Sequence, residues 1–250
     1  MHGQGKQSLS TRSETTEDWE REFELKPVGH RDSYPVFGDY KRILHEDDNL
    51  VWLPSKGRVI YRGWDFGKVH PCVEFAQCFG NSKNYIDELY GDNILFEPFI
   101  QQVLGHSNIN FPGCTFVDWV DVSGRNEDAW GNSSIKSMRQ YGLHPRGRDQ
   151  SVEEGIRLMC QDLVRLEDGH PYFRLNSSKC VQLASAMRSG YKRNKKGEII
   201  KDGVNDHPVD AARYLYQGVG SDTSKDWSKI QDKLKKQYGK FPRDGRQVRR

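Results

Sequence analysis

The sequence predicts a mixed α/β protein in which a sheet is flanked by helices. Between residues 58 and 90, runs of β-branched and aromatic residues and an alternation of apolar with polar residues indicate strands. After residue 95 the apolar period changes to nearly four, which indicates helices, and these alternate with short strand-like runs. A strand meander followed by αβ alternation is typical of a mixed sheet covered by helices.

The first strands are expected to form an antiparallel meander. The run 58–67 is rich in aromatic and β-branched residues, and Gly67 marks its end. The alternating segment 72–79 should pair with it as a hairpin, and 84–90 is the predicted third strand. Ahead of them, 34–53 is expected to hold irregular structure and one strand.

The next unit is a helix from Leu95 to Leu104, expected to end at Gly105, followed by a strand from Thr115 to Val120. A strand, helix, strand unit of this length normally makes its two strands parallel. The other expected elements are helices over 133–141, 152–166, 179–187 and 207–216, with extended segments over 143–146 and 172–175. Ser151 is the predicted cap of the 152–166 helix, with Glu154 completing a capping box.

Charge is distributed unevenly along the chain. Residues 221–250 hold ten Lys and Arg against four Asp, and the other 220 residues hold 28 bases against 31 acids, so the net charge of +3 divides into +6 and −3. A mildly acidic body with a basic tail suits a protein that meets a polyanion. A solvated tail without a partner is the alternative for the last ten residues.

No run approaches 18 consecutive apolar residues and no signal peptide is recognisable, so we expect a soluble intracellular protein without membrane contact. The five cysteines are odd in number and scattered without a C-x-x-C pair, which argues against a disulfide scaffold or a zinc cluster. The expected domain organisation is a flexible lead with a short helix over 1–35, one domain over 36–220 that includes a basic hairpin at 190–203, and a basic tail over 221–250.

Three acids stand where predicted elements begin or end. Asp65 closes the 58–67 strand, Asp121 follows the 115–120 strand, and Asp210 lies in the first turn of the last helix. A carboxylate buried alone costs several kcal/mol, so Asp65 needs a cation, a basic partner or water. Carboxylate oxygens suit hard Mg²⁺ or Mn²⁺. We therefore expect the three acids to converge on divalent metal.

Each acid also has a structural interpretation. The alternatives are an ion pair of Asp65 with Arg62 or Lys68, an Asx turn at Asp121, and a favourable helix dipole at Asp210. Asp118 competes with Asp121 for the metal role, but its place inside the strand makes it less accessible.

Five motifs follow one another along the chain: Tyr61-Arg-Gly-Trp-Asp-Phe-Gly67 with His70-Pro71, Phe116-Val-Asp-Trp-Val-Asp121-Val-Ser-Gly-Arg125, Ser151-Val-Glu-Glu-Gly-Ile-Arg157, Gly190-Tyr-Lys-Arg193 and His207-Pro-Val-Asp210-Ala-Ala-Arg-Tyr214. In this order and spacing they resemble the C-terminal nuclease domain of the large terminase subunit of tailed bacteriophages, and the resemblance covers residues 17 to 217. It implies a ribonuclease H-like fold, with the family's three acidic motifs at Asp65, Asp121 and Asp210. One departure is Val122, where many relatives have proline.

For the chemistry, Asp65 is expected to bridge two Mg²⁺ or Mn²⁺ ions, with Asp121 on one ion and Asp210 on the other. Asp206 and His207 are secondary candidates, either as an additional metal ligand or as a group near the leaving oxygen. DNA phosphates are expected to meet bases beside the acids and on the hairpin, namely Lys68, Arg125, Lys192, Arg193, Lys195 and Lys196. Ion pairs with nearby acids, or solvated charges without a partner, are the alternatives.

The resemblance implies a metal-dependent endonuclease that cuts double-stranded viral DNA concatemers during genome packaging in the host cell cytoplasm. The family's full-length members carry an ATPase domain ahead of the nuclease, but no G-x-x-x-x-G-K-[ST] motif occurs here. The expected partners are therefore that ATPase domain, the small terminase subunit and the portal. Two alternatives remain: another ribonuclease H-like nuclease such as a junction resolvase, and a non-catalytic DNA-clamping module.

Overall fold

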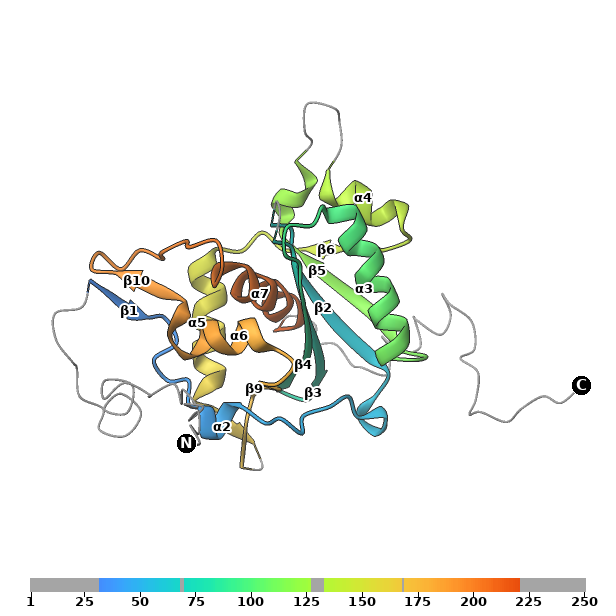
Figure 1. Ribbon diagram of the computed structural model, residues 1–250. Coiled ribbons are helices and arrows are strands. Elements are labelled where there is room, and N and C mark those ends of the chain that lie inside the picture. The colour runs from blue at the N-terminus through green and yellow to red at the C-terminus, as the bar shows by residue number, and fades with distance from the viewer. Residues whose placement is uncertain (1–31, 68–69, 127–132, 168, 221–250) are drawn as a thin grey trace, which may run out of the picture.

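The computed structural model describes residues 32–67, 70–126, 133–167 and 169–220, which form a six-stranded mixed sheet with helices on both faces (Figure 1). Residues 1–31 of the expected lead, Lys68 and the basic tail lie outside the described residues, whereas residues 33–35, expected to belong to the flexible lead, form a strand. The strand order is β6-β5-β2-β3-β4-β9. The strands are β2 (Val59–Asp65), β3 (Cys72–Phe79), β4 (Ser82–Tyr90), β5 (Thr115–Val120), β6 (Arg146–Gly147) and β9 (Phe173–Leu175).

The strand directions confirm the predicted meander and the predicted parallel unit. β2 pairs with β3, and β3 with β4, in antiparallel fashion, whereas β5 runs parallel to β2. The short strands β6 and β9 add parallel edges beside β5 and β4. The sheet is therefore mixed, as the sequence predicts.

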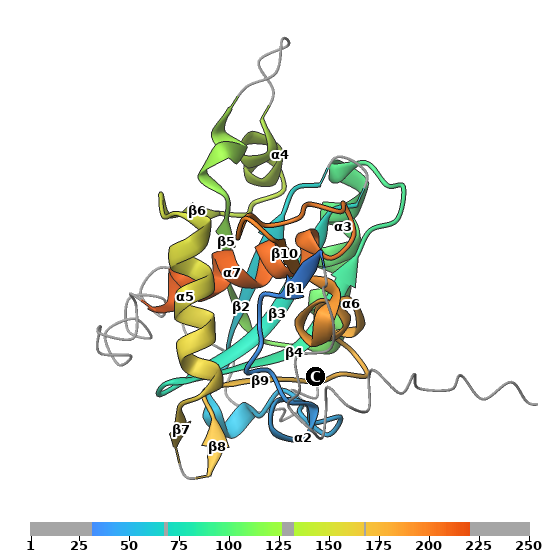
Figure 2. The same ribbon diagram turned by 90° about the vertical axis from the view of Figure 1, so that its left-hand side faces the viewer.

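Helices that follow the strand meander along the chain cover the two faces (Figures 1 and 2). The helices α5 (Val152–Leu163), α6 (Val181–Ser185) and α7 (Asp206–Gly220) pack on one face, and α3 (Phe96–Asn110) and α4 (Ser134–Gln140) pack on the other. Side chains of β2 alternate between the faces, because Tyr61 belongs to the core under α7 while Ile60 and Trp64 belong to the core under α3.

The smaller elements lie at the margins of the sheet. A two-stranded ribbon joins β1 (Ser33–Pro35) to β10 (Lys192–Asn194), and a second joins β7 (Leu166–Glu167) to β8 (His170–Pro171). The short helical segments are α2 (Arg42–His45), η1 (Pro54–Lys56), η2 (Val122–Arg125) and a π-helical turn, η3 (Ala186–Gly190). None of the helices in the described ranges is long and apolar enough to cross a membrane.

The predicted end of α3 at Gly105 is wrong, because the helix continues to Asn110. A glycine inside a helix costs about 1 kcal/mol relative to alanine. The turn that follows Gly105 buries Ser107, and Phe111 beyond it closes the helix with a backbone bond to the Ser107 carbonyl. This tertiary packing outweighs the unfavourable helix propensity of one glycine.

Two further boundaries differ from expectation near α5. Ser151 caps the helix as predicted, with its Oγ accepting from the Glu154 amide at 3.1 Å. The Glu154 carboxylate, however, is bound by the Arg157 guanidinium at 2.6 and 2.8 Å, so it is turned away from the predicted capping box. The helix also ends at Leu163, three residues early, because Leu166 and Glu167 pair in the β7–β8 ribbon.

Gly63 allows α7 to lie directly on β2. A methyl group at Gly63 would collide with the carbonyl oxygen of Ala211 and with Cβ of Leu215. The buried residues Val209, Ala212 and Leu215 make α7 apolar on the side that meets the sheet, as the helical spacing predicts. This close approach brings the first turns of α7 beside the end of β2.

Candidate active site

Asp65 and Asp121 lie at the same edge of the sheet. The parallel register pairs Trp64 with Val120, and each acid is the next residue along its chain. Because parallel strands end at the same edge, the two backbones present their acids side by side. The sequence-based placement of these two residues is thus reproduced by the register.

Asp210 approaches this edge from α7, where it is 8 % exposed. Burial raises the pKa of Asp65, the hydrogen bond from His207 opposes that change, and the negative charge of Asp210 adds to it. Tyr214 lies one turn after Asp210, and burial is the largest cause of its raised pKa. The negative charges of Asp210, Asp121 and Asp65 raise this pKa further. The charges of all three predicted acids therefore raise the pKa of one partly buried tyrosine.

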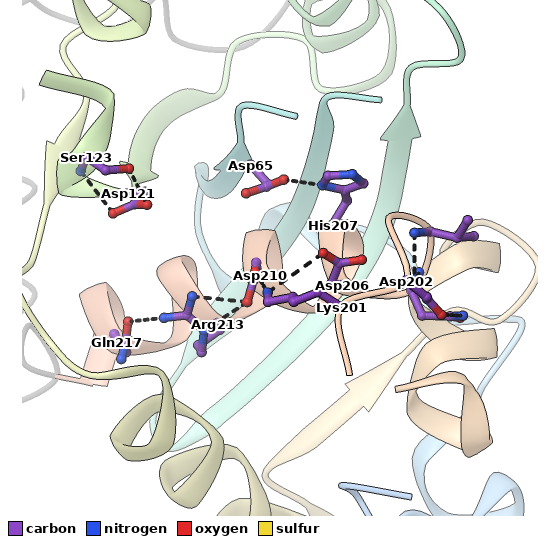
Figure 3. Close-up of polar contacts among 12 residues, drawn as sticks. Asp65, Asp121, Ser123, Lys201, Asp202, Asp206, His207, Asp210, Arg213 and Gln217 are labelled. Atoms are coloured by element: carbon purple, nitrogen blue, oxygen red, sulfur yellow. Dashed lines mark hydrogen bonds and ion pairs between the residues drawn. The ribbon is translucent and has the colours of Figure 1, made fainter. Parts of the chain in front are cut away.

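Each of the three acids is held by a donor from the protein itself (Figure 3). Asp65 Oδ2 lies 2.6 Å from Nδ1 of His207. Asp121 accepts from the amide and the hydroxyl of Ser123 at 3.0 and 2.5 Å, which is the Asx-type cap named as its alternative.

Asp210 is bound by two cations. Its Oδ1 accepts from Nε and Nη2 of Arg213 at 3.2 and 3.1 Å, and its Oδ2 accepts from the ammonium group of Lys201. Lys201 also lies 3.8 Å from Oδ2 of Asp206, whose Oδ1 is buried without a hydrogen-bond partner among the described residues. The helix therefore begins with two carboxylates on either side of one lysine.

The acids do not share an ion position in this conformation. Across 32–67, 70–126, 133–167 and 169–220, no three His, Cys, Asp or Glu side chains form a group that could hold a metal ion. In Figure 3, Asp121 turns toward Ser123 while Asp65 turns toward His207. The donor chemistry nevertheless suits a hard divalent cation, because the acids offer only carboxylate oxygens and one oxygen of Asp206 lacks a partner among the residues described.

Asp118 has a structural role, and this excludes one alternative for Asp65. The guanidinium of Arg62 binds both oxygens of Asp118, and the indole of Trp64 donates to Oδ1 at 2.7 Å. Both charged side chains are almost fully buried. The alternative in which Arg62 pairs with Asp65 is therefore wrong.

The predicted DNA-contacting bases differ in availability. Arg125 is exposed at the end of η2, but the guanidinium of Arg193 binds Glu153 at 2.5 and 2.8 Å and the carbonyl of Gly197 at 2.7 Å. Lys195 lies 2.5 Å from Asp32. For Arg193 and Lys195 the ion-pair alternative is therefore the observed one. The ammonium groups of Lys192 and Lys196 have no ion-pair partner within the described part of the chain.

Two site residues carried little or no signal in the sequence. His207 was one of several second-rank candidates, and only the α7–β2 contact shows that it is the partner of Asp65. Lys201 was not identified, because it belongs to an aperiodic loop nine residues before Asp210. No spacing rule links a loop lysine to a helical acid at that separation.

Comparison with solved structures finds large terminases. A large terminase from a thermophilic bacteriophage matches with a TM-score of 0.58 and 17% identity over 84% of this chain and 52% of that chain. The large terminase nuclease of the thermophilic phage G20c, with bound magnesium, matches with a TM-score of 0.50 and 12% identity over 74% of this chain and 97% of that chain. The same nuclease with bound cobalt gives a TM-score of 0.51.

These matches confirm the predicted resemblance at the level of the fold, so the chain has the ribonuclease H-like fold of large terminase nuclease domains. The match spans about half the length of the first of these proteins, the longer large terminase. No protein-family model and no curated protein sequence matches the chain.

Proposed function

We propose that this chain is a terminase-type, metal-dependent endonuclease that cuts double-stranded viral DNA concatemers during genome packaging. The observation that supports the proposal is that Asp65 and Asp121 follow two parallel strands which end side by side, while Asp210 of α7 lies near enough to Asp65 for its charge to raise the pKa of Asp65. The likeness to a terminase nuclease with bound magnesium or cobalt supports the metal dependence.

In this proposal Asp65 contributes to both of two Mg²⁺ or Mn²⁺ sites, Asp121 to one and Asp210 to the other, with Asp206 as a possible additional ligand. When bound, such ions make water nucleophilic and stabilise charge on the attacking and leaving oxygens of the phosphodiester. His207 holds the Asp65 carboxylate in place through its Nδ1 contact. Arg213 holds Asp210 through Oδ1, so Oδ2, which Lys201 contacts, is the oxygen that would bind an ion.

The proposed substrate contact is mainly to the phosphate backbone. Arg125 at the end of η2, and Lys192 and Lys196 near the β1–β10 ribbon, are the described bases best able to provide it. Lys68 and the basic tail remain proposals of the same kind outside the described residues. Contacts of this type give weak sequence preference and a steep dependence on salt.

The proposed assembly follows from the match to the longer large terminase, since that protein is about twice the length of the matched region. We propose that this domain works beside an ATPase domain, with the small terminase subunit and the portal as partners, in the host cell cytoplasm. The proposed domain boundaries are a nuclease domain over 36–220 and a basic tail over 221–250.

The decisive experiment is cleavage of supercoiled plasmid with Mn²⁺ or Mg²⁺. Nicking and linearisation should require the ion, stop with a chelator, and be lost in Asp65→Asn, Asp121→Asn and Asp210→Asn. Asp39→Asn, which removes an exposed acid, is the matched control and should cut normally. Cleavage that survives any two of the three substitutions would refute the assignment of the site. DNA binding without cleavage would instead favour a clamping module, and a strong preference for four-way junctions would favour a resolvase.

A further inference from the structure

The two cations that bind Asp210 differ in how firmly they are held. Arg213 is 2 % exposed, and its guanidinium also donates to Gln217 Oε1 at 3.2 Å, while Gln217 donates to the carbonyl of Ser151 at 3.0 Å. The side chain of Lys201 is 49% exposed. A cation that binds Asp210 would displace the half-exposed Lys201 ammonium group at Oδ2 far more readily than the buried Arg213 guanidinium at Oδ1.

The backbone on both sides of Lys201 is fixed. Ile200 donates its amide to the carbonyl of Lys192 at 2.9 Å. After Lys201, the Asp202 carboxylate accepts from the amides of Val204 and Asn205 at 2.9 and 2.7 Å. Departure of the ammonium group therefore needs only rotation of a long, half-exposed side chain, and the loop itself stays in place.

The ammonium group of Lys201 lies beside two buried carboxylates, where a cation binds favourably. It contacts Oδ2 of Asp210 and lies 3.8 Å from Oδ2 of Asp206. Both acids are at least nine-tenths buried, and Asp206 Oδ1 lacks a hydrogen-bond partner in the described ranges. Two buried carboxylates one helical turn apart require a positive charge between them.

We propose that the ammonium group of Lys201 occupies a cation position between Asp206 and Asp210, and that a divalent ion binds there by exchange with Lys201. The inference rests on the proposed function, since it takes Asp210 as a metal ligand. It adds that Lys201 competes with the divalent ion for the Asp210 carboxylate. Exchange leaves Lys201 charged and free at the edge of the site, where it can meet a DNA phosphate. Without the ion, Lys201 and Arg213 together supply the positive charges that balance the two acids.

The test measures Mn²⁺ binding to chelator-treated protein by isothermal titration calorimetry, without DNA. Lys201→Met removes the competing charge and should lower the Kd for Mn²⁺ by about three- to fivefold, which corresponds to removal of one half-exposed ion pair. Lys196→Met removes the same net charge from the same hairpin without touching the acids, and should change the Kd by less than about twofold because distant charges are screened. Asp210→Asn in the Lys201→Met background should abolish the gain.

A Kd for Lys201→Met that equals or exceeds that of the unmodified chain would overturn the exchange, as would an equal gain in Lys196→Met. Lys201→Gln serves as a second neutral variant, and thermal unfolding of each protein checks that it is folded. Plasmid cleavage separates the two proposals. Tighter Mn²⁺ binding in a protein that never cuts DNA supports the exchange and defeats the nuclease function, whereas unchanged binding in a protein that cuts supports the function and defeats the exchange.

Discussion

Arg62 and Asp118 face each other across the β2–β5 pair and form two hydrogen bonds, Nε to Oδ1 at 2.7 Å and Nη2 to Oδ2 at 2.9 Å. The same guanidinium donates to Ser107 of α3 at 3.0 Å. The pair thus ties two central strands to the helix that covers them. Its partners are satisfied on every side, which is the condition under which a buried ion pair is tolerated.

Asp118→Ala should lower the free energy of unfolding by about 3 to 5 kcal/mol, because it leaves the buried Arg62 charge without its partner. Urea denaturation measures the change. Glu154→Ala is the control, since it breaks an exposed pair with Arg157 and should cost no more than about 1 kcal/mol. Equal losses in the two variants would contradict the structural role of Asp118.

The His207–Asp65 contact predicts a dependence of stability on pH. The hydrogen bond to Asp65 raises the pKa of His207 against the effect of burial. A folded pKa above the unfolded one stabilises the protein fully below about pH 6.5, and that stabilisation is lost as the pH rises through the folded pKa. The free energy of unfolding, measured in urea with chelator, should therefore fall as the pH rises from about 6.5 through the folded pKa of His207.

His207→Asn should remove most of this decline. Burial also raises the pKa of Asp65, so the stability linked to protonated Asp65 is lost as the pH rises from about 4 through its folded pKa, and that part of any decline remains in His207→Asn. His144→Asn is the control, as an exposed histidine. A decline that persists unchanged in His207→Asn would show that other groups cause it.

Two glycine substitutions should have opposite effects. Gly63→Ala places a methyl group against the Ala211 carbonyl and should destabilise the protein by about 1 to 3 kcal/mol, because α7 must move off β2. Gly105→Ala, in the exposed middle of α3 where no atom lies within 4 Å of the new methyl group, should stabilise it by about 0.5 to 1 kcal/mol. Thermal and urea unfolding give both values, and a stabilising Gly63→Ala would contradict the close approach of α7.

The hairpin bases should separate into two classes in DNA binding. Lys192→Ala and Lys196→Ala should each weaken binding and reduce the slope of log affinity against log salt by about one, as expected for loss of one phosphate contact. Arg193→Ala should change the slope less, because its guanidinium is already bound to Glu153. Titrations at several salt concentrations, with the chelator present, measure the slopes. Equal slopes in all three variants would argue against DNA contact by the two lysines.

The sequence predicted those parts of the fold that depend on local pattern. The alternation in 72–79 and the apolar spacing of Val209, Ala212 and Leu215 are set by which side chains face the core, so β3 and α7 were found and oriented correctly. The end of α3 was missed, because burial of Ser107 and Phe111 beyond Gly105 is a tertiary effect. The length of a helix depends on what its last turn contacts, which one segment of sequence does not contain.

The site divides in the same way. Asp65 and Asp121 were placed by strand ends and by the parallel register, which follow from local pattern and connection length. Their contacts with His207 and Ser123, and the insertion of Lys201 beside Asp210, depend on side-chain directions in a folded molecule. The choice between Asp118 and Asp121 could be made from sequence, since strand interior and strand end differ in accessibility.

The central place of β2 in the sheet has a consequence for the motion of the site. This strand is hydrogen-bonded on both sides and covered by α7 and α3, so its amides should exchange with solvent only through the rarest openings of the protein. Lys201, by contrast, extends from a loop at the molecular margin. Asp65 is thus anchored in the slowest-opening part of the domain, while the half-exposed side chain of Lys201 changes rotamer on a much shorter timescale.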